Sequence, residues 1–490
     1  MKRYISVIIL IFALISILVL SSCSEKVGGG YIYTIDDGGV TLRQYLGFKR
    51  DVVIPTEIDG YPVRYVGQQA FQRKHITSVT IPEGVTEIQS SAFKQCKHLT
   101  SVKLPNSLLI IGHSAFSGCS SLESIYITRN VTEIGTMAFN ECSSLRSINF
   151  PNSLTTIGMW AFQNCDSLEN IPLGYGIKNI ESYIFKDCDK ILVNIWENGA
   201  YYPSENNPYF ALYGMVDRDC ESFEIHPDTK IICGNALEKA VSVKEIMIPE
   251  GVISICDWAF HYCDSAEKIS LPSTLEFISD FYVFPDIVAP LKEITVPESS
   301  QYFKIVNGAL LSADGKSLIK YPQKMEGTEF TVPDGVEYIY ANAFENADYL
   351  TSITFPDSLI KIGNCAFSDC SSLKDINWGN GLKIIGDACF NNCDSLERVI
   401  IPDSVEELDG FAYCDNLREI VIGKGVVEIE RWAFLGSDNL ENIVFLDPNG
   451  WYGSVMFSRR YEDIDFTDSH KNVTLINDEL SQYWLFKKTE

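Results

Sequence analysis

Residues Leu99–Cys119 read L-T-S-V-K-L-P-N-S-L-L-I-I-G-H-S-A-F-S-G-C, and the same pattern returns at Leu122–Cys142, Leu145–Cys165 and Leu168–Cys188. The cysteines that end these copies follow one another at a step of 23 residues, and a phenylalanine stands three residues before each of them. A fixed period in the twenties, with apolar residues at fixed offsets, is typical of a solenoid. The repeat therefore predicts one elongated array in which each coil packs on its neighbours.

The residues within one repeat predict the path of one coil. Val102 and Leu104 alternate with polar residues, as in a strand with one buried face. Pro105 has no N–H and ends this strand. A second short extended piece follows at residues 109–111, and short helical segments are expected on the other side of the coil. We expect the phenylalanine and the cysteine of each repeat to point inward, since no single coil can bury its own apolar face.

The charge of the chain narrows the choice of partners. The formal net charge is −26 at pH 7. A strongly acidic surface repels phosphate backbones and anionic membrane surfaces, so we do not expect nucleic acid as a partner. The simpler interpretation of the acidity is that it keeps the protein soluble.

Most of the 15 cysteines belong to the repeat. Nine occupy one column: Cys96, Cys119, Cys142, Cys165, Cys188, Cys263, Cys370, Cys393 and Cys414. Ser437 takes the next place in this column, which indicates that the position needs a small side chain. We interpret the column as buried free thiols. Stacked disulfides and a metal site stay as alternatives, although no C-x-x-C pair and no Cys/His cluster at zinc spacing occurs.

The N-terminus has the layout of an export signal. Lys2 and Arg3 precede an apolar run from Ile5 to Leu20, which is short for a membrane-spanning helix. The tetrad that ends at Cys23 resembles the bacterial lipobox, which implies that residues 1–22 are removed and that Cys23 carries lipid. An ordinary secretory peptide is the alternative. Residues 23–30 are polar and glycine-rich, so we expect a flexible tether.

Breaks in the repeat divide the rest of the chain. We expect an N-terminal cap at 31–66, repeats at 67–196, a hairpin insertion at 197–230, repeats at 231–297, a second hairpin insertion at 298–327, repeats at 328–445 and a C-terminal cap at 446–490. The cap at 31–66 should contain a hairpin around Asp37 to Gly39. The insertions should turn at Asp217 to Asp219 and at Ala313 to Gly315. They share a pattern, so we interpret them as one module used twice.

The outward positions of the first strand are the candidate ligand face. Stacked coils bring these side chains into one polar row, and a solenoid offers an extended binding surface. The candidate residues are Lys103, Tyr126, Asn149, Asn170, Thr354, Asp375, Asn377 and Arg398. A solvated face that binds nothing is the simpler interpretation of any single residue. No catalytic motif, metal site or cofactor site is expected, because the six histidines form no close pair in the sequence and no phosphate loop or nucleophile elbow occurs.

The repeat unit L-x-x-I-x-L-P-x-x-L-x-x-I-G-x-x-A-F-x-x-C resembles the BspA-like, or treponemal-type, leucine-rich repeats of bacterial surface proteins. The resemblance covers nearly all of residues 31–490. It implies a leucine-rich repeat solenoid, exported and often attached to the cell, that binds other macromolecules and has no catalytic residues.

Three hypotheses about function follow. The first is a lipid-anchored protein on the exterior of a bacterial cell that binds a protein or glycan ligand and contacts the membrane through its N-terminal lipid. The second is a structural or scaffold protein of the cell envelope. The third, an enzyme, has no motif in its favour.

Overall fold

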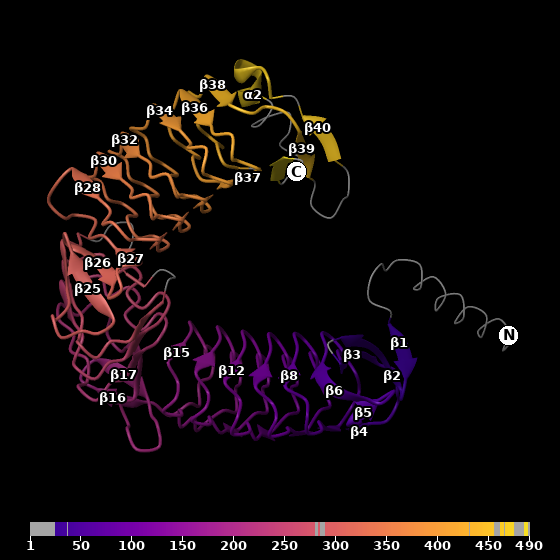
Figure 1. Ribbon diagram of the computed structural model, residues 1–490. Coiled ribbons are helices and arrows are strands. Elements are labelled where there is room, and N and C mark those ends of the chain that lie inside the picture. Colours follow the sequence, from indigo (N-terminus) through magenta and orange to yellow (C-terminus); the bar gives the residue numbers. More distant parts are fainter. Residues whose placement is uncertain are drawn as a thin grey trace. The chain divides into compact units, whose positions relative to one another are not determined.

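The structure is a computed structural model that describes residues 25–36, 38–279, 283–284, 290–430, 432–454, 461–464, 466–474 and 485–488. The expected signal peptide and Cys23 lie outside these ranges. The chain forms two compact units. Unit 1 comprises Met1–Ile177 and Tyr183–Leu192, and unit 2 comprises Lys178–Ser182 and Val193–Glu490. Within each unit, successive coils stack on one another (Figure 1).

Both units are solenoids of stacked coils with two short strands per regular coil. The first strand of one coil pairs in parallel with the first strand of the next, as Ser78 does with Ser101. The second strands pair in the same way, as Ile110 does with Glu133. Both pairs are 23 residues apart, so the sequence period equals one coil. The predicted solenoid of short strands is confirmed.

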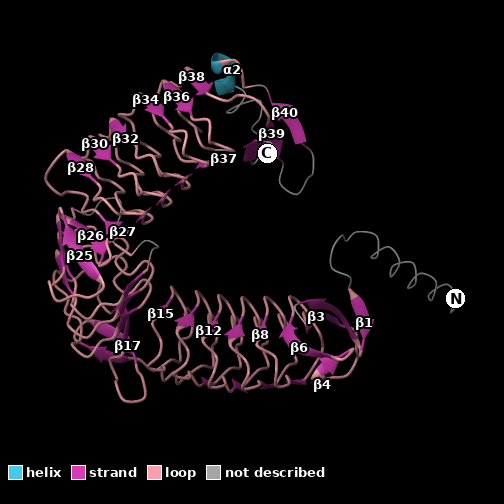
Figure 2. Ribbon diagram, in the orientation of Figure 1, coloured by secondary structure: helices cyan, strands magenta, loops and turns pink. Residues whose placement is uncertain are grey.

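Turns, and not helical segments, connect the second strand to the next coil. Ala115 N–H donates to Gly112 O at 3.1 Å within the coil, whereas Phe116 N–H donates to Ala138 O at 2.7 Å in the next coil. Ser114 and Gly118 have φ angles of 53° and 73°, which no α-helix permits. The expected short helical segments are therefore wrong for these coils. Among the described residues, α2 (Ser469–Thr474) is the one α-helix (Figure 2).

Unit 1 contains one long sheet and two short ones. The second strands form the long sheet, with β1 (Lys26–Gly28), β2 (Tyr31–Asp36), β3 (Gly39–Tyr45), β6 (Tyr61–Val66), β8 (Glu87–Ile88), β10 (Ile110–Ile111), β12 (Glu133–Ile134) and β14 (Thr156–Ile157) in that order. The strand β5 (Glu57–Ile58) pairs with β6. The first strands form β4 (Asp51–Val53), β7 (Ser78–Thr80) and β9 (Ser101–Lys103), and separately β11 (Ser124–Ile125) and β13 (Ser147–Ile148).

Unit 2 begins with β15 (Asn179–Ile180) and has two successive sets of sheets. In the first set, the second-strand sheet contains β16 (Asn194–Trp196), β17 (Gly199–Tyr202), β18 (Ala211–Met215), β19 (Ile231–Ile232), β21 (Ser254–Ile255) and β23 (Phe277–Ile278). The first-strand sheet contains β20 (Glu245–Met247), β22 (Lys268–Ser270) and β24 (Glu293–Thr295).

The second set is the longer one. Its second-strand sheet runs through β25 (Phe303–Val306), β26 (Ala309–Ser312), β27 (Ser317–Lys320), β29 (Tyr338–Ile339), β31 (Lys361–Ile362), β33 (Ile384–Ile385), β35 (Glu407–Leu408) and β37 (Glu428–Glu430), and then through the antiparallel strands β41 (Leu485–Lys488), β39 (Trp451–Ser454) and β40 (Tyr461–Ile464). Its first-strand sheets contain β28 (Glu329–Thr331), β30 (Ser352–Thr354) and β32 (Asp375–Asn377), and separately β34 (Arg398–Ile400), β36 (Glu419–Ile422) and β38 (Asn442–Phe445). Because β41 pairs with the last parallel strand, the C-terminal residues occupy that edge of the sheet.

A three-stranded antiparallel meander starts each second-strand sheet. The meanders are β1–β2–β3, β16–β17–β18 and β25–β26–β27, and the last strand of each pairs in parallel with the first regular coil. Their first turns have two residues each, at Gly29-Gly30, Glu197-Asn198 and Asn307-Gly308. The predicted module therefore occurs three times. Its first copy includes the hairpin expected around Asp37 to Gly39.

Two details of the sequence prediction differ from these meanders. Residues 26–28 were expected in a flexible tether, but they form β1, because Gly29 and Gly30 adopt the positive φ angles of a tight hairpin turn. Asp217 to Asp219 were expected at the tip of the first insertion, but they follow β18. The strands that pair are β17 and β18, so the loop between them runs over residues 203–210. The turn expected at Ala313 to Gly315 does connect β26 to β27.

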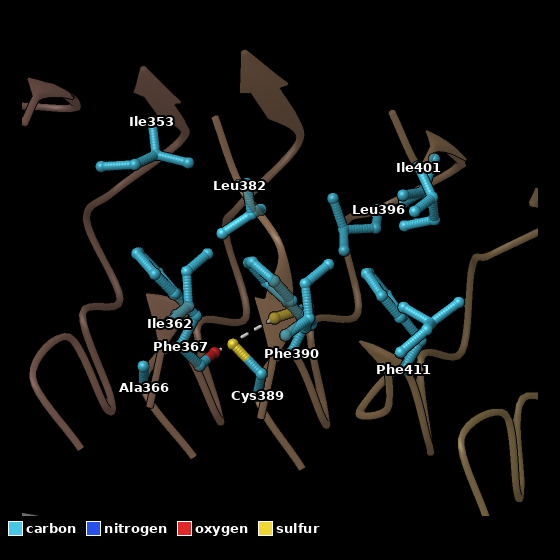
Figure 3. Packing of buried hydrophobic residues seen from close by; sticks show 14 of the residues in the cluster. Ile353, Ile362, Ala366, Phe367, Leu382, Cys389, Phe390, Leu396, Ile401 and Phe411 are labelled. Atoms are coloured by element: carbon cyan, nitrogen blue, oxygen red, sulfur yellow. Dashed lines mark hydrogen bonds between the residues drawn. The ribbon is translucent and has the colours of Figure 1, made fainter. Parts of the chain in front are cut away.

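The core of each unit contains a stack of phenylalanine rings. In unit 1, Phe139 is completely buried, with its ring centroid 5.3 Å from that of Phe116 and 5.2 Å from that of Phe162. The three rings are parallel to within 7°. In unit 2, Phe367, Phe390 and Phe411 stack in the same way (Figure 3). The predicted inward direction of this column is confirmed.

The cysteine column forms a second buried row. Cys142 Sγ–H donates to the carbonyl oxygen of Phe116 at 3.3 Å, and the other column thiols bond to equivalent carbonyls. Ser437 Oγ–H donates to Phe411 O at 2.9 Å, so the serine in this column makes the same bond. Each described cysteine is a free thiol. Burial raises the pKa of Cys142 to about 12, which leaves the thiol protonated and unreactive.

Candidate functional site

Three of the four candidate residues in unit 1 present their side chains to solvent. Lys103 ends β9, and Tyr126 follows β11 in the next coil. The Tyr126 side chain is 70% exposed. Asn170, which is also exposed, lies beside Ser147 through an isolated parallel bridge. A role of these residues in ligand binding stays a prediction.

Asn149 has a different environment. Its side chain is half-buried, and Ile127 N–H donates to its Oδ1 at 2.8 Å while its Nδ2–H donates to Ile127 O at 2.8 Å. The amide thus satisfies both backbone groups of a residue in the preceding coil. We infer that Asn149 holds two coils together and has little capacity left for a ligand.

The four candidates in unit 2 also lie on first strands. Asp375, Asn377 and Arg398 are exposed, and Thr354 is half-buried. Asn377 Nδ2–H donates to Thr354 Oγ1 at 3.3 Å. Arg398 Nε lies 2.7 Å from Glu419 Oε1, so its charge is already paired. This face is polar, and some of its hydrogen-bonding and charged groups are already paired with one another.

Large apolar side chains stand among these polar residues. Tyr126 is 70% exposed after β11, Met247 is 67% exposed on β20, and Ile400 is 46% exposed on β34. Single exposed apolar residues are ordinary on protein surfaces. Here Met247 and Ile400 lie on paired strands of unit 2, and Tyr126 directly follows a paired strand of unit 1.

Sequence reasoning missed the continuity of the second strands. These strands form the long sheets. Leu109, Ile360 and Val427, which are 43%, 47% and 44% exposed, directly precede β10, β31 and β37. Exposed ion pairs such as Lys383 Nζ to Glu406 Oε1, at 2.7 Å, cross between neighbouring coils. A second-strand segment has only two or three residues, so alternation within it is too short to identify a sheet from sequence.

A depression lies beside the shortened repeat of unit 2. Its volume is about 470 Å³, and its lining includes Asp387, Asp409, Tyr413 and Trp432. Burial raises the pKa of Asp409 to about 7, and the charge of Asp387 adds to this effect. Gly410 N–H donates to Asp409 Oδ1 at 2.5 Å and opposes the shift. The chemistry available here is uptake of a proton near neutral pH.

No group of three or more His, Cys, Asp or Glu side chains within the described ranges is arranged to hold a metal ion. Over the same residues, the structure has no helix with the length and hydropathy needed to cross a bilayer.

Comparison with known proteins identifies the repeat. The family described as BspA type leucine rich repeat region matches residues 64–192, 216–312, 323–441 and 409–480, in 6 copies. No curated protein matches the chain.

Several solved structures of bacterial leucine-rich repeat proteins are similar. A leucine rich cell surface protein from Faecalibacterium prausnitzii is 27% identical, with 88% of this chain and 96% of that chain covered and a TM-score of 0.35. The leucine rich repeat protein of T. pallidum is 34% identical, with 34% and 80% covered and a TM-score of 0.33. The pneumococcal vaccine antigen PcpA is 18% identical, with 87% and 94% covered and a TM-score of 0.31. Because the family pattern matches most of its length, the chain belongs to the BspA-type leucine-rich repeat family.

Proposed function

We propose that this protein is exported, anchored by lipid at Cys23 to the exterior of a bacterial cell, and binds a protein or glycan ligand through its first-strand sheets. The observation that supports this most is the exposure of Tyr126, which is 70%. Tyrosine combines a large contact area with a hydroxyl group, and such residues dominate the energy of many interfaces. Lys103, exposed in the preceding coil, adds a cation beside it.

The function proposed is non-catalytic. The thiols of the cysteine column are buried. Burial raises the pKa of Cys142 and of Cys370 to about 12, so these two thiols are poor nucleophiles. The free thiols Cys220 and Cys365 are half-buried. Adhesion or ligand capture needs no such group, because affinity comes from contact area and complementarity.

A capture experiment tests the binding function. The chain without residues 1–23 is immobilised and exposed to mixed extracts of host matrix and bacterial surfaces, and bound proteins are identified by mass spectrometry. A host protein captured by wild type and lost in Tyr126→Ala supports adhesion. The matched control is Leu109→Ala, since Leu109 is 43% exposed but belongs to the second-strand side of unit 1.

Two other outcomes are informative. Capture of only bacterial envelope proteins would favour the scaffold alternative, and the host-binding function would be abandoned. Binding to glycan arrays without any captured protein would favour a glycan ligand. Equal loss in both variants would place the contact elsewhere.

Lipid anchoring has its own test. Cells producing the full chain are extracted with a phase-separating detergent, and wild type is expected in the detergent phase. Cys23→Ala should move the protein to the aqueous phase or to the medium, because Cys23 is the residue proposed to carry the acyl chains and alanine cannot carry them. An unchanged distribution would contradict the proposed anchor.

A further inference from the structure

Charge is distributed unevenly along the chain. Residues 25–103 contain ten Lys and Arg against eight Asp and Glu, for a net charge of +2, whereas residues 104–490 contain 27 against 57, for a net charge of −30. The repulsion expected between this protein and an anionic surface therefore comes from the later coils. The N-terminal end of unit 1 is the part that an anionic partner can approach.

Four cations, one phenylalanine ring and two imidazole rings gather on consecutive coils at that end. We call this group the end patch, and it consists of Phe48, Lys49, Arg50, Lys74, His75, Lys97 and His98. Its register is set by backbone bonds between coils: Thr77 N–H donates to Arg50 O at 2.7 Å, and Thr100 N–H donates to Thr77 O at 2.9 Å. The residues two positions earlier, Phe48, His75 and His98, thus hold equivalent places in three successive coils. The rings of His75 and His98 lie 5.3 Å apart.

The phenylalanine of the end patch is fully exposed. Phe48 has 101% of its reference accessible surface, and Val53 in the same cap is 74% exposed. Phe48 and Val53 line an open depression of about 890 Å³ at the N-terminal end of unit 1. An exposed ring beside cations is the combination by which proteins insert an apolar group among lipid headgroups while basic groups contact the phosphates.

The cations of the end patch are available. Lys49, Arg50, Lys74 and Lys97 form no ion pair within the described part of the chain, and all of the described ion pairs lie in unit 2. Asp51 follows Arg50 in the sequence, and its carboxylate accepts hydrogen bonds from Thr77 Oγ1 at 2.9 Å and from Ser78 Oγ at 2.7 Å. These bonds lower the pKa of Asp51, so its negative charge is held by hydroxyl groups and not by the patch. Glu57 and Asp59 also line the depression.

The chain path places this patch next to the expected lipid. Glu25 is the first described residue and stands two positions after Cys23. Strand β1 follows at once, and its turn reaches the loop that carries Phe48, since Leu46 N–H donates to Gly30 O at 2.8 Å. A lipid on Cys23 would therefore hold the bilayer within a few residues of the end patch.

We propose that the end patch docks on an anionic lipid bilayer, with Phe48 in the headgroup layer and Lys49, Arg50, Lys74 and Lys97 against lipid phosphates. This orientation deepens the membrane attachment proposed above, and it gives the anchored protein a second contact with the membrane besides its lipid. A basic patch beside a lipid anchor adds electrostatic attraction to anionic lipids.

Vesicle sedimentation of the chain without residues 1–23 tests the proposal. All of the described contacts lie within residues 25–488, so this chain keeps the described fold. It carries no Cys23, so failure of lipid anchoring cannot affect the result. Binding is expected to phosphatidylcholine vesicles that contain phosphatidylserine, and not to phosphatidylcholine alone. Each surface cation changes affinity by about fivefold at low salt, so Lys74→Gln with Lys97→Gln should weaken binding about 30-fold.

Matched variants separate the patch from general charge. Phe48→Ser should weaken vesicle binding without lowering the unfolding midpoint, because the ring has no buried contact to lose. Lys186→Gln with Lys190→Gln removes two exposed lysines from the last coil of unit 1 and should leave binding unchanged. Equal weakening by both lysine pairs, or no binding of wild type to anionic vesicles, would overturn the proposal. Binding to heparin without binding to vesicles would also overturn it, since the ligand would then be a soluble polyanion.

Discussion

Replacing Phe139 by alanine tests the stacked core most sharply. The ring is completely buried and lies 5.3 and 5.2 Å from its two neighbours. Two lost ring contacts cost about 0.5–1.5 kcal/mol each. Loss of the buried apolar surface costs about 1.5–3 kcal/mol more. The sum, about 2.5–6 kcal/mol, brackets the range of about 3–5 kcal/mol found for phenylalanine-to-alanine changes in cores, which is the loss expected here.

The assay is urea unfolding of the chain without residues 1–23, followed by circular dichroism. Tyr126→Ala is the matched control, because it removes a ring from the same run of coils at a position 70% exposed, where a change within about 0.5 kcal/mol is expected. Each coil touches only its neighbours, so the loss at Phe139 should destabilise the coils on both sides of it. Equal costs for the two variants would refute the assignment of inside and outside.

Three further predictions follow from the buried polar groups. Cys142→Ser should cost less than Cys142→Ala in a urea melt, because only serine keeps a donor for the carbonyl of Phe116, and the alanine variant should lose about 1–2 kcal/mol; the reverse order would contradict the hydrogen bond. The pKa of Asp409 is raised from 3.8 to about 7, so the contribution of Asp409 to stability should be lost as the pH rises from about 4 to about 7. Asp409→Asn should therefore stabilise the chain by about 2 kcal/mol at pH 8 and by much less at pH 4. An equal effect at both pH values would show that the carboxyl titrates normally. Native protein without residues 1–23 should react with a thiol reagent first at the half-buried Cys220 and Cys365, and prompt reaction of the column cysteines without denaturant would contradict their burial.

The array was predictable because its signal repeats. The 23-residue step of the phenylalanine and cysteine columns specifies which side chains must stack, and Phe139 and Cys142 are both completely buried. The sequence also showed that Ser437 replaces a cysteine of the column. The structure explains this exchange, because Ser437 donates to the carbonyl of Phe411, which is equivalent to the carbonyls that the column thiols bond. Periodicity specifies these features many times over, so local irregularities do not obscure them.

The meanders were harder to predict, because their decisive signals are dipeptides. Asn307-Gly308 and Gly29-Gly30 are two-residue hairpin turns with positive φ at both positions. The second was interpreted as part of a flexible tether, because glycine-rich sequence is typical of both structures. Asn198-Gly199 is a related dipeptide. Had it been recognised as a turn signal, the first turn of the insertion would have been predicted there and not at Asp217.

The sequence could predict that the candidate residues point outward, but it could not predict the contacts that their side chains make. Alternation in the first strands identified Lys103 and Tyr126 as outward residues. Alternation could not show that the Asn149 amide hydrogen-bonds to the backbone of Ile127, or that Arg398 is paired with Glu419. Those contacts depend on the stacking of neighbouring coils. The end patch was missed for a different reason, since the net charge of the whole chain hides the excess of cations in its first coils.

The most direct test of the central claim is a saturation binding measurement between the chain without residues 1–23 and the ligand identified by capture. Lys103→Ala with Tyr126→Ala should raise the dissociation constant at least about tenfold, because a central aromatic residue and its neighbouring cation carry a large share of interface energy. Leu109→Ala should leave it unchanged, and the circular dichroism of both variants should match wild type. An unchanged dissociation constant in the double variant, or an equal rise with Leu109→Ala, would contradict a ligand face on the first strands.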